Sequence, residues 1–155
     1  MKIMDFLSKK SILADLKSTK KEDVIKELVD LLISSGEIDK SSRAKILDSL
    51  SERESLGSTA IGQGIAIPHA KVDCVGKLIG AFALSKKGVD FDSLDGEPVY
   101  IFFLLLAAQD SAGPHLKALA RISRLFKDKY FRDNLRSCAD ENAIIDVISQ
   151  EDEKI

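Results

Sequence analysis

Two stretches near the start of the chain carry apolar residues at the spacing of an amphipathic helix. The first follows Thr19–Glu22, which has the form of a capping box. Its apolar positions are Val24, Leu28, Leu31 and Leu32. They predict a helix that ends near Gly36. A second stripe predicts a helix from about Asp39, and its apolar positions are Ala44, Ile46, Leu47 and Leu50.

Other apolar runs are short and continuous, as in buried strands. Ser11–Leu16 predicts a strand or an extended entry to the fold, and Leu78–Leu84 and Val99–Leu106 predict core strands. Ile65–Ile67 is a shorter run of β type, and we expect it to stop at Pro68. The residue that follows this proline is therefore predicted to lie at a strand end.

Loop-forming segments separate these elements. Gly57–Gly64 contains three glycines in eight residues, and Asp90–Pro98 is rich in turn-forming residues. A further loop at Asp110–Gly113 precedes Pro114, which suits the first position of a helix. The predicted inward positions of that helix are Leu119, Ile122, Leu125 and Phe126.

Two more short helices are predicted near Tyr130–Arg136 and Glu141–Ile148. The charged tail QEDEKI, about residues 150–155, is expected to fray. Helices and buried strands thus interleave along the chain, which predicts an α/β fold with a mixed β-sheet. Because no internal repeat or linker is evident, residues 1–155 are expected to form a single domain.

Composition narrows the class of protein. An apolar content of 45% with 31% charged residues is typical of a soluble globular protein. The longest apolar run, Val99–Ala108, has ten residues and cannot span a bilayer, so no direct membrane insertion is expected. The net charge of −2 does not suggest a broad nucleic-acid-binding surface. Cys74 and Cys138 form no CxxC motif, which favours a reducing compartment, the cytoplasm.

Several common site motifs are absent or incomplete in the sequence. Gly62–Ile67 begins like a dinucleotide-binding GxGxxG motif, but it lacks the third glycine and Pro68 blocks the required helix. There is no phosphate-binding GxxxxGK[ST] loop and no GxSxG nucleophile elbow. The histidines and cysteines have no close-paired zinc spacing, so neither a metal nor a cofactor is expected.

Three polar residues beside the predicted loops are candidates for chemistry. His69 follows Pro68, and a histidine that is neutral at pH 7 can attack phosphorus through a ring nitrogen. His115 falls in the first turn of a predicted helix, where unpaired N–H groups favour anions. Arg53 precedes the glycine loop and could bind phosphate oxygens with its planar guanidinium.

Each candidate also has a simpler explanation. A histidine at a strand end is commonly a surface residue, and His115 can be an ordinary polar residue of a first turn. Arg53, near a helix C-terminus, can pair with exposed carbonyl groups. Four lysines are by default solvated charges: Lys71, Lys86, Lys87 and Lys117. The residue pattern alone therefore indicates no more than a possible histidine site on an α/β domain.

A longer segment adds a resemblance to a known family. Arg53–His69, RESLGSTAIGQGIAIPH, resembles the signature of the enzyme IIA domains of the fructose–mannitol class. These domains belong to the phosphoenolpyruvate-dependent phosphotransferase system. The resemblance continues through Phe91–Ala107 and Gly113–Ser123, so it spans nearly the whole chain. It implies the family fold, the type-2 enzyme IIA fold, in which helices flank a mixed β-sheet.

The resemblance also implies roles for the three candidates. His69 would be the phosphorylated residue, at Nε2, with His115 beside it to stabilise the phosphate and Arg53 to supply charge. A phosphocarrier protein of the HPr type would be the phosphoryl donor. Phospho-His69 would then pass the group to a cysteine of an enzyme IIB partner, or would act as a charged signal to a regulated target protein. Neither ATP nor a bound metal is implied.

Two branches of the family remain open, together with one different class. Sugar-transport members feed a permease, whereas nitrogen-related members regulate other proteins according to their phosphorylation state. We expect the regulatory branch, because GSTAIGQGIAIPH resembles it more and the sequence contains neither an enzyme IIB domain nor a membrane segment. The alternative of another class is a binding module on the same fold that has lost phosphotransfer. The presence of both histidines and Arg53 argues against it.

Overall fold

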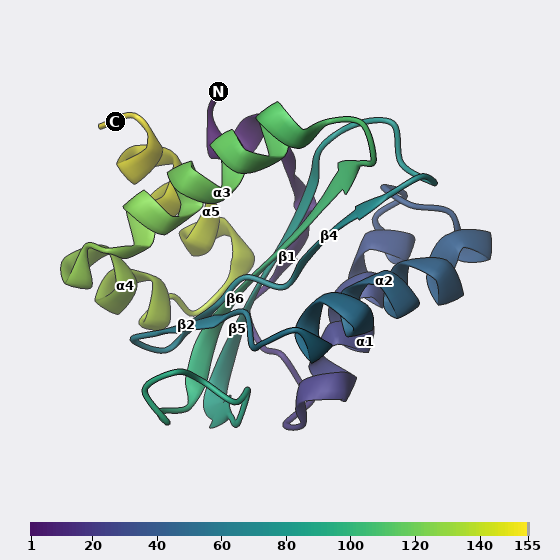
Figure 1. The fold of residues 1–155 in the computed structure, drawn as a ribbon. Helices are drawn as coiled ribbons and strands as arrows, with labels where there is room; N and C mark the ends of the chain where they lie inside the picture. Colours follow the sequence, from purple (N-terminus) through teal and green to yellow (C-terminus); the bar gives the residue numbers. More distant parts are fainter. Residues whose placement is uncertain (155) are drawn as a thin grey trace.

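The longest apolar run of the sequence forms the central strand of a mixed β-sheet (Figure 1). The computed structural model describes residues 1–154. The strands are β1 (Leu7–Leu13), β2 (Ala60–Gly62), β3 (Ile65–Ala66), β4 (His69–Val72), β5 (Ile79–Val89) and β6 (Val99–Ala108). The helices are α1 (Lys21–Ser34), α2 (Arg43–Ser55), α3 (Ala112–Phe126), α4 (Lys129–Arg136) and α5 (Glu141–Asp152). The strand order is β1-β5-β6-β3-β2, with β4 also paired to β6.

Strand β6 is buried on both faces, which explains why its sequence is apolar without alternation. It pairs antiparallel with β5 and parallel with β3 and β4. On one face α1 and α2 cover the sheet, and α3, α4 and α5 cover the other (Figure 1). The side chains of β6 alternate between these layers: Phe102, Leu104 and Leu106 on the α1–α2 side, and Ile101, Phe103 and Leu105 on the α3–α5 side. The predicted α/β class with a mixed sheet is confirmed.

The N-terminal elements differ from the prediction in their starting points. Strand β1 begins four residues earlier than the predicted Ser11, because Leu7 already pairs with Gly80 of β5. The predicted capping box does not form: the residue that precedes α1 is Lys20, without a side-chain cap. Lys20 is held extended by a bridge to Asp90, so the helix starts after it. Helix α2 starts behind a short 3₁₀ turn rather than at residue 39.

The sequence predicts that a strand stops at Pro68, but it does not predict the strand β4 that begins directly after this proline. The chain passes through the proline, whose carbonyl oxygen accepts a hydrogen bond from the Leu105 N–H at 2.9 Å. Pairing with β6 then resumes, with His69 opposite Leu105. His69 is therefore the first residue of a strand, not the end of one. Proline removes only a donor, and its carbonyl group can still join the ladder.

The C-terminal part also extends further than predicted. Helix α3 begins at Ala112, so Pro114 is its third residue rather than its first. The prediction of a frayed tail is wrong as far as Asp152, which ends α5 and is 2% exposed. Its carboxylate accepts hydrogen bonds from the Ile3 N–H at 2.6 Å and from Arg121 Nε at 2.8 Å. These contacts explain why the two ends of the chain lie close together (Figure 1). None of the helices within residues 1–154 combines the length and the apolar composition that a membrane span requires.

Candidate functional site

The ring of His69 is oriented by the backbone that precedes it. Its Nδ1 lies 2.7 Å from the carbonyl oxygen of Ile67. Because a carbonyl oxygen can only accept, this contact requires that Nδ1 carry the proton. Nε2 is then the nitrogen that carries the lone pair. The neutral ring is thus fixed in the tautomer that a nucleophilic Nε2 needs.

His115 lies beside His69 and comes from α3, one of the helices that cover the sheet. It is the fourth residue of α3 and only 7% exposed, and the two ring centroids are 5.4 Å apart in an edge-to-face arrangement. Its backbone N–H donates to the Ser111 carbonyl, so it is not the free anion-binding group that the sequence suggested. Its ring, in contrast, faces that of His69. Its Nε2 is buried and has no hydrogen-bond partner within residues 1–154.

Arg53 belongs to the last turn of α2 and is joined to the glycine loop. Its Nη1 donates to the Gly57 carbonyl at 2.8 Å, which is the carbonyl pairing expected of an arginine near a helix end. The guanidinium has further N–H groups beyond this contact. The structure brings the three predicted site residues together, since Arg53, His69 and His115 line one open cavity of about 480 Å³.

The surroundings of both histidines favour the neutral form, because they lower the pKa of each ring. Burial lowers the pKa of His69, and the positive charge of Arg53 lowers this pKa further, against the opposing effects of the Ile67 carbonyl and the Glu54 carboxylate. The pKa of His115 is lowered by burial first, then by repulsion from the His69 ring when that ring is protonated, and then by the charge of Lys71. A neutral imidazole is the nucleophilic form, so the site favours attack by nitrogen at pH 7.

The cavity also contains residues that sequence reasoning left aside. Lys71 and Gln109 line it, although Lys71 was assigned to the solvated surface. The signal for Lys71 is the two-residue alternation of a strand, which puts residues 69 and 71 of β4 on one face. That signal became usable only once β4 was recognised. Lys71 adds a second positive charge to the cavity that Arg53 also lines.

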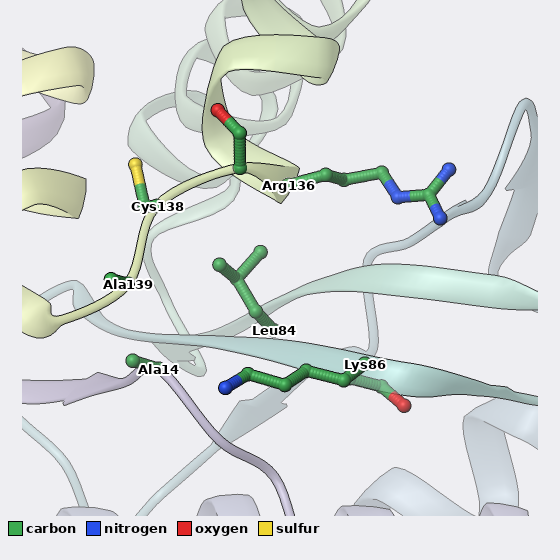
Figure 2. Close-up of a pocket in the computed structure, with 8 residues that line it drawn as sticks. Ala14, Leu84, Lys86, Arg136, Cys138 and Ala139 are labelled. Carbon is green, nitrogen blue, oxygen red and sulfur yellow. The ribbon is translucent and has the colours of Figure 1, made fainter.

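Two other cavities lack this chemistry. One, of about 340 Å³, lies between β5 and the end of α4, where Figure 2 shows Arg136 extending away from Cys138. The Arg136 guanidinium stacks on the Tyr100 ring, 3.7 Å from its centroid. The other, of about 570 Å³, lies between α1 and α2. Within residues 1–154, no group of three histidine, cysteine or acidic residues could hold a metal ion.

Residues 5–151 match the family model described as "Phosphoenolpyruvate-dependent sugar phosphotransferase system, EIIA 2". The chain belongs to this family. This EIIA chain is 39% identical over 149 residues to a nitrogen regulatory protein of Bradyrhizobium diazoefficiens. The alignment covers 96% of this chain and 95% of that relative. It is also 41% identical over 152 residues to a fructose-specific EIIABC component of Bacillus subtilis. That alignment covers 98% of this chain but only 24% of the relative, so the chain spans about a quarter of that protein's length.

Solved structures agree with the family assignment. The EIIA chain matches the nitrogen regulatory protein IIA-Ntr of Neisseria meningitidis with a TM-score of 0.85 and 32% identity, over 94% of this chain and 98% of that one. It matches the mannitol IIA of Escherichia coli with a TM-score of 0.75 and 20% identity, over 90% and 96% of the two chains. The second match shows the shared fold alone. Together they confirm the predicted type-2 enzyme IIA fold.

Proposed function

We propose that this protein is a phosphoryl carrier that accepts a phosphoryl group on Nε2 of His69. The observation that carries the proposal is the 2.7 Å contact between His69 Nδ1 and the Ile67 carbonyl, beside Arg53 and His115 in one cavity. The donor is a phosphohistidine on an HPr-type phosphocarrier protein. A bond forms between Nε2 and phosphorus while the phosphorus–nitrogen bond of the donor breaks. The donor imidazole keeps the electron pair of the broken bond and takes up a proton from solvent, while His69 keeps its proton on Nδ1 and becomes an N-phosphorylated imidazolium.

The neighbouring side chains then stabilise the transferred group. In phosphoryl transfer a protein contributes mainly by positioning and by balancing charge. Arg53 is already close to the site, with N–H groups beyond its bond to Gly57 available to phosphate oxygens. The buried Nε2 of His115, without a partner within residues 1–154, can donate to a phosphate oxygen once that nitrogen carries the proton.

We infer that the phosphorylation state regulates partner proteins. A phosphoryl group adds about −1.5 to −2 charges, which is enough to favour one docking partner and repel another. The near full-length match to a nitrogen regulatory protein supports this branch. We expect the protein to carry out this regulation in the cytoplasm. We expect it neither to bind nucleic acid nor to insert into a membrane.

A second candidate function is sugar transport, in which phospho-His69 passes its group to a cysteine of a separate enzyme IIB. The 41% identity to a fructose-specific EIIABC component favours it. The binding-module alternative, in which the fold is kept without phosphotransfer, predicts no labelling at all. Measuring transfer to a purified enzyme IIB of the fructose class separates the transport function from the regulatory one.

The deciding experiment is incubation with a radiolabelled phospho-HPr-type carrier. We expect one acid-labile, base-stable phosphate per chain. His69→Gln should remove it, and Lys127→Gln, an exposed residue beyond the end of α3, should keep it. Absence of label on the wild-type protein, or undiminished label on His69→Gln, contradicts the proposal.

A further inference from the structure

One buried carboxylate next to the site has no role in the steps above. Glu54 follows Arg53 on α2, and its side chain is only 7% exposed. Its oxygens accept the backbone N–H of Thr59 at 3.1 Å and also the hydroxyl of Thr59. The ammonium of Lys21 lies 3.0 Å away and balances the charge. A buried carboxylate with this many donors is a fixed anchor, because each donor holds it in one position.

From Thr59 a chain of hydrogen bonds leads to the ring of His69. The carbonyl of Thr59 accepts the N–H of Ile67 at 3.0 Å. The carbonyl of Ile67 in turn accepts Nδ1 of His69 at 2.7 Å. Ile67 is 3% exposed, so water cannot easily replace either partner. The direction of the Ile67 carbonyl therefore depends on the position of Thr59.

The segment between Glu54 and Ile67 needs such an anchor. Gly57, Gly62 and Gly64 have φ values of 145°, 96° and 80°, and Gln63 also has a positive φ of 59°. These backbone conformations are readily adopted by glycine but confer little rigidity. Thr59 is 3% exposed and lies within this segment, where it is fixed through two bonds to Glu54.

We propose that Glu54, acting through Thr59 and Ile67, is a positioning residue that holds His69 in the Nδ1–H tautomer. The consequence for catalysis rests on the proposed function, but the tautomer itself does not. The neutral side chain of histidine in water prefers to carry its proton on Nε2, so the opposite tautomer must be imposed by the protein. Lys21 compensates the charge of Glu54, and this allows a carboxylate to lie so near a residue that would carry phosphate.

The test is the tautomer of His69 in the unphosphorylated protein. Two-bond ¹H–¹⁵N correlation spectra at pH 8 distinguish a ring protonated on Nδ1 from one protonated on Nε2. The chain has two histidines, so a His115→Gln variant assigns the signals of His69. The wild type should show mainly Nδ1–H. Glu54→Gln should lower the ratio of Nδ1–H to Nε2–H by about two- to tenfold, the range that one hydrogen bond supports.

Matched variants separate this role from general damage to the fold. Glu54→Gln keeps the shape of the side chain. An amide, however, cannot accept the hydrogen bonds of both the N–H and the hydroxyl of Thr59 and also pair with Lys21. Thr59→Val removes one of the two bonds and should shift the ratio in the same direction, whereas Thr59→Ser should restore the wild-type ratio. Asp48→Asn removes an exposed carboxylate from the same helix and should leave the ratio unchanged. Amide spectra of α3–α5 report whether each variant is folded.

The tautomer result stands apart from the fate of the proposed function. If the wild-type protein takes no phosphate, the proposed function fails, yet the spectra still decide the role of Glu54. If phosphate is taken, Glu54→Gln should lower kcat about two- to tenfold with an unchanged KM for the donor, because the docking surface is not altered. An unchanged Nδ1–H signal in both Glu54→Gln and Thr59→Val overturns the inference.

Discussion

The ring of His115 meets the ring of His69 edge to face, with 5.4 Å between their centroids, and its buried Nε2 has no hydrogen-bond partner within residues 1–154. Leaving a buried polar atom unpaired costs about 1–3 kcal/mol, so such an arrangement calls for a functional explanation. A phosphoryl group on His69 would supply the acceptor. Under the proposed function, the unphosphorylated site is thus prepared for the negative charge of the incoming phosphoryl group.

His115→Ala should keep the phosphoryl acceptor but slow its use. We expect the protein still to take up one phosphate on His69, with forward and reverse transfer rates lowered about 10²-fold, the scale for one lost transition-state donor. Rapid-quench measurements with a phosphorylated HPr-type carrier give both rates. Wild-type rates in both directions are incompatible with the role assigned to His115.

Replacement of Arg53 should affect chemistry more than stability. Arg53→Ala should lower the phosphorylation rate about 10²-fold, and Arg53→Lys should fall between it and the wild type, because lysine keeps the charge but not the planar fork. The free energy of unfolding should fall by no more than about 1.5 kcal/mol, because only the exposed bond to Gly57 is lost. Equal rates for the lysine and alanine variants would mean that charge has no part in the function of Arg53.

The sequence was sufficient for the central strand and for the helices, because long apolar patterns such as Val99–Ala108 and the α1 stripe are local signals. It failed at β4, whose pairing with β6 joins residues more than thirty positions apart. Nothing near Pro68 indicates that the chain pairs again after the proline. The tail was misjudged for the same reason, since Asp152 is held by residues 3 and 121.

In the candidate site, too, the features set by local sequence could be predicted, and those set by contacts between distant residues could not. The local motifs around Arg53, His69 and His115 were visible in the sequence, and the structure brings these residues into one cavity. Glu54 was not found, because its burial depends on Lys21 and Thr59, and one of these is 33 residues away. A glutamate near a helix end is otherwise an ordinary solvated charge. Residues that act through others are the hardest to predict from local pattern.

Acidification should destabilise the protein through its histidines. The pKa of both His69 and His115 is lowered in the folded state from the ordinary 6.5, so the unfolded chain binds more protons as the pH falls through 6.5. The free energy of unfolding should have its full value above pH 6.5. It should decrease as the pH falls below 6.5, and level off once the pH is below the folded-state pKa values of the two histidines. The slope is at most about 1.4 kcal/mol per pH unit for each histidine.

Urea unfolding between pH 7.5 and 5.5 measures this loss. The carboxyl groups with lowered pKa, such as Asp73 and Asp95, start from an ordinary value of 3.8 and contribute little in that range. His69→Gln/His115→Gln should therefore show a flatter dependence than the wild type. An identical slope in both proteins, or a wild type that becomes more stable on acidification, rules out the histidine explanation.

The contact between the chain ends should carry a large share of the stability. Asp152 is 2% exposed and pairs with Arg121, with 2.6 Å between Nη2 and Oδ1, while it also accepts the Ile3 N–H. Asp152→Asn removes the negative charge from a buried ion pair and weakens the hydrogen bonds that the carboxylate accepts from Ile3 and Arg121, which should cost about 1.5–3 kcal/mol. Glu153→Gln is the matched control. Glu153 is 77% exposed, and its carboxylate forms a long ion pair with Lys2, with 3.8 Å between the two charged groups. That exposed pair should contribute less than about 1 kcal/mol. Urea unfolding of the two variants should therefore give clearly separated midpoints; coincident midpoints would show that the Asp152 contacts do not stabilise the fold.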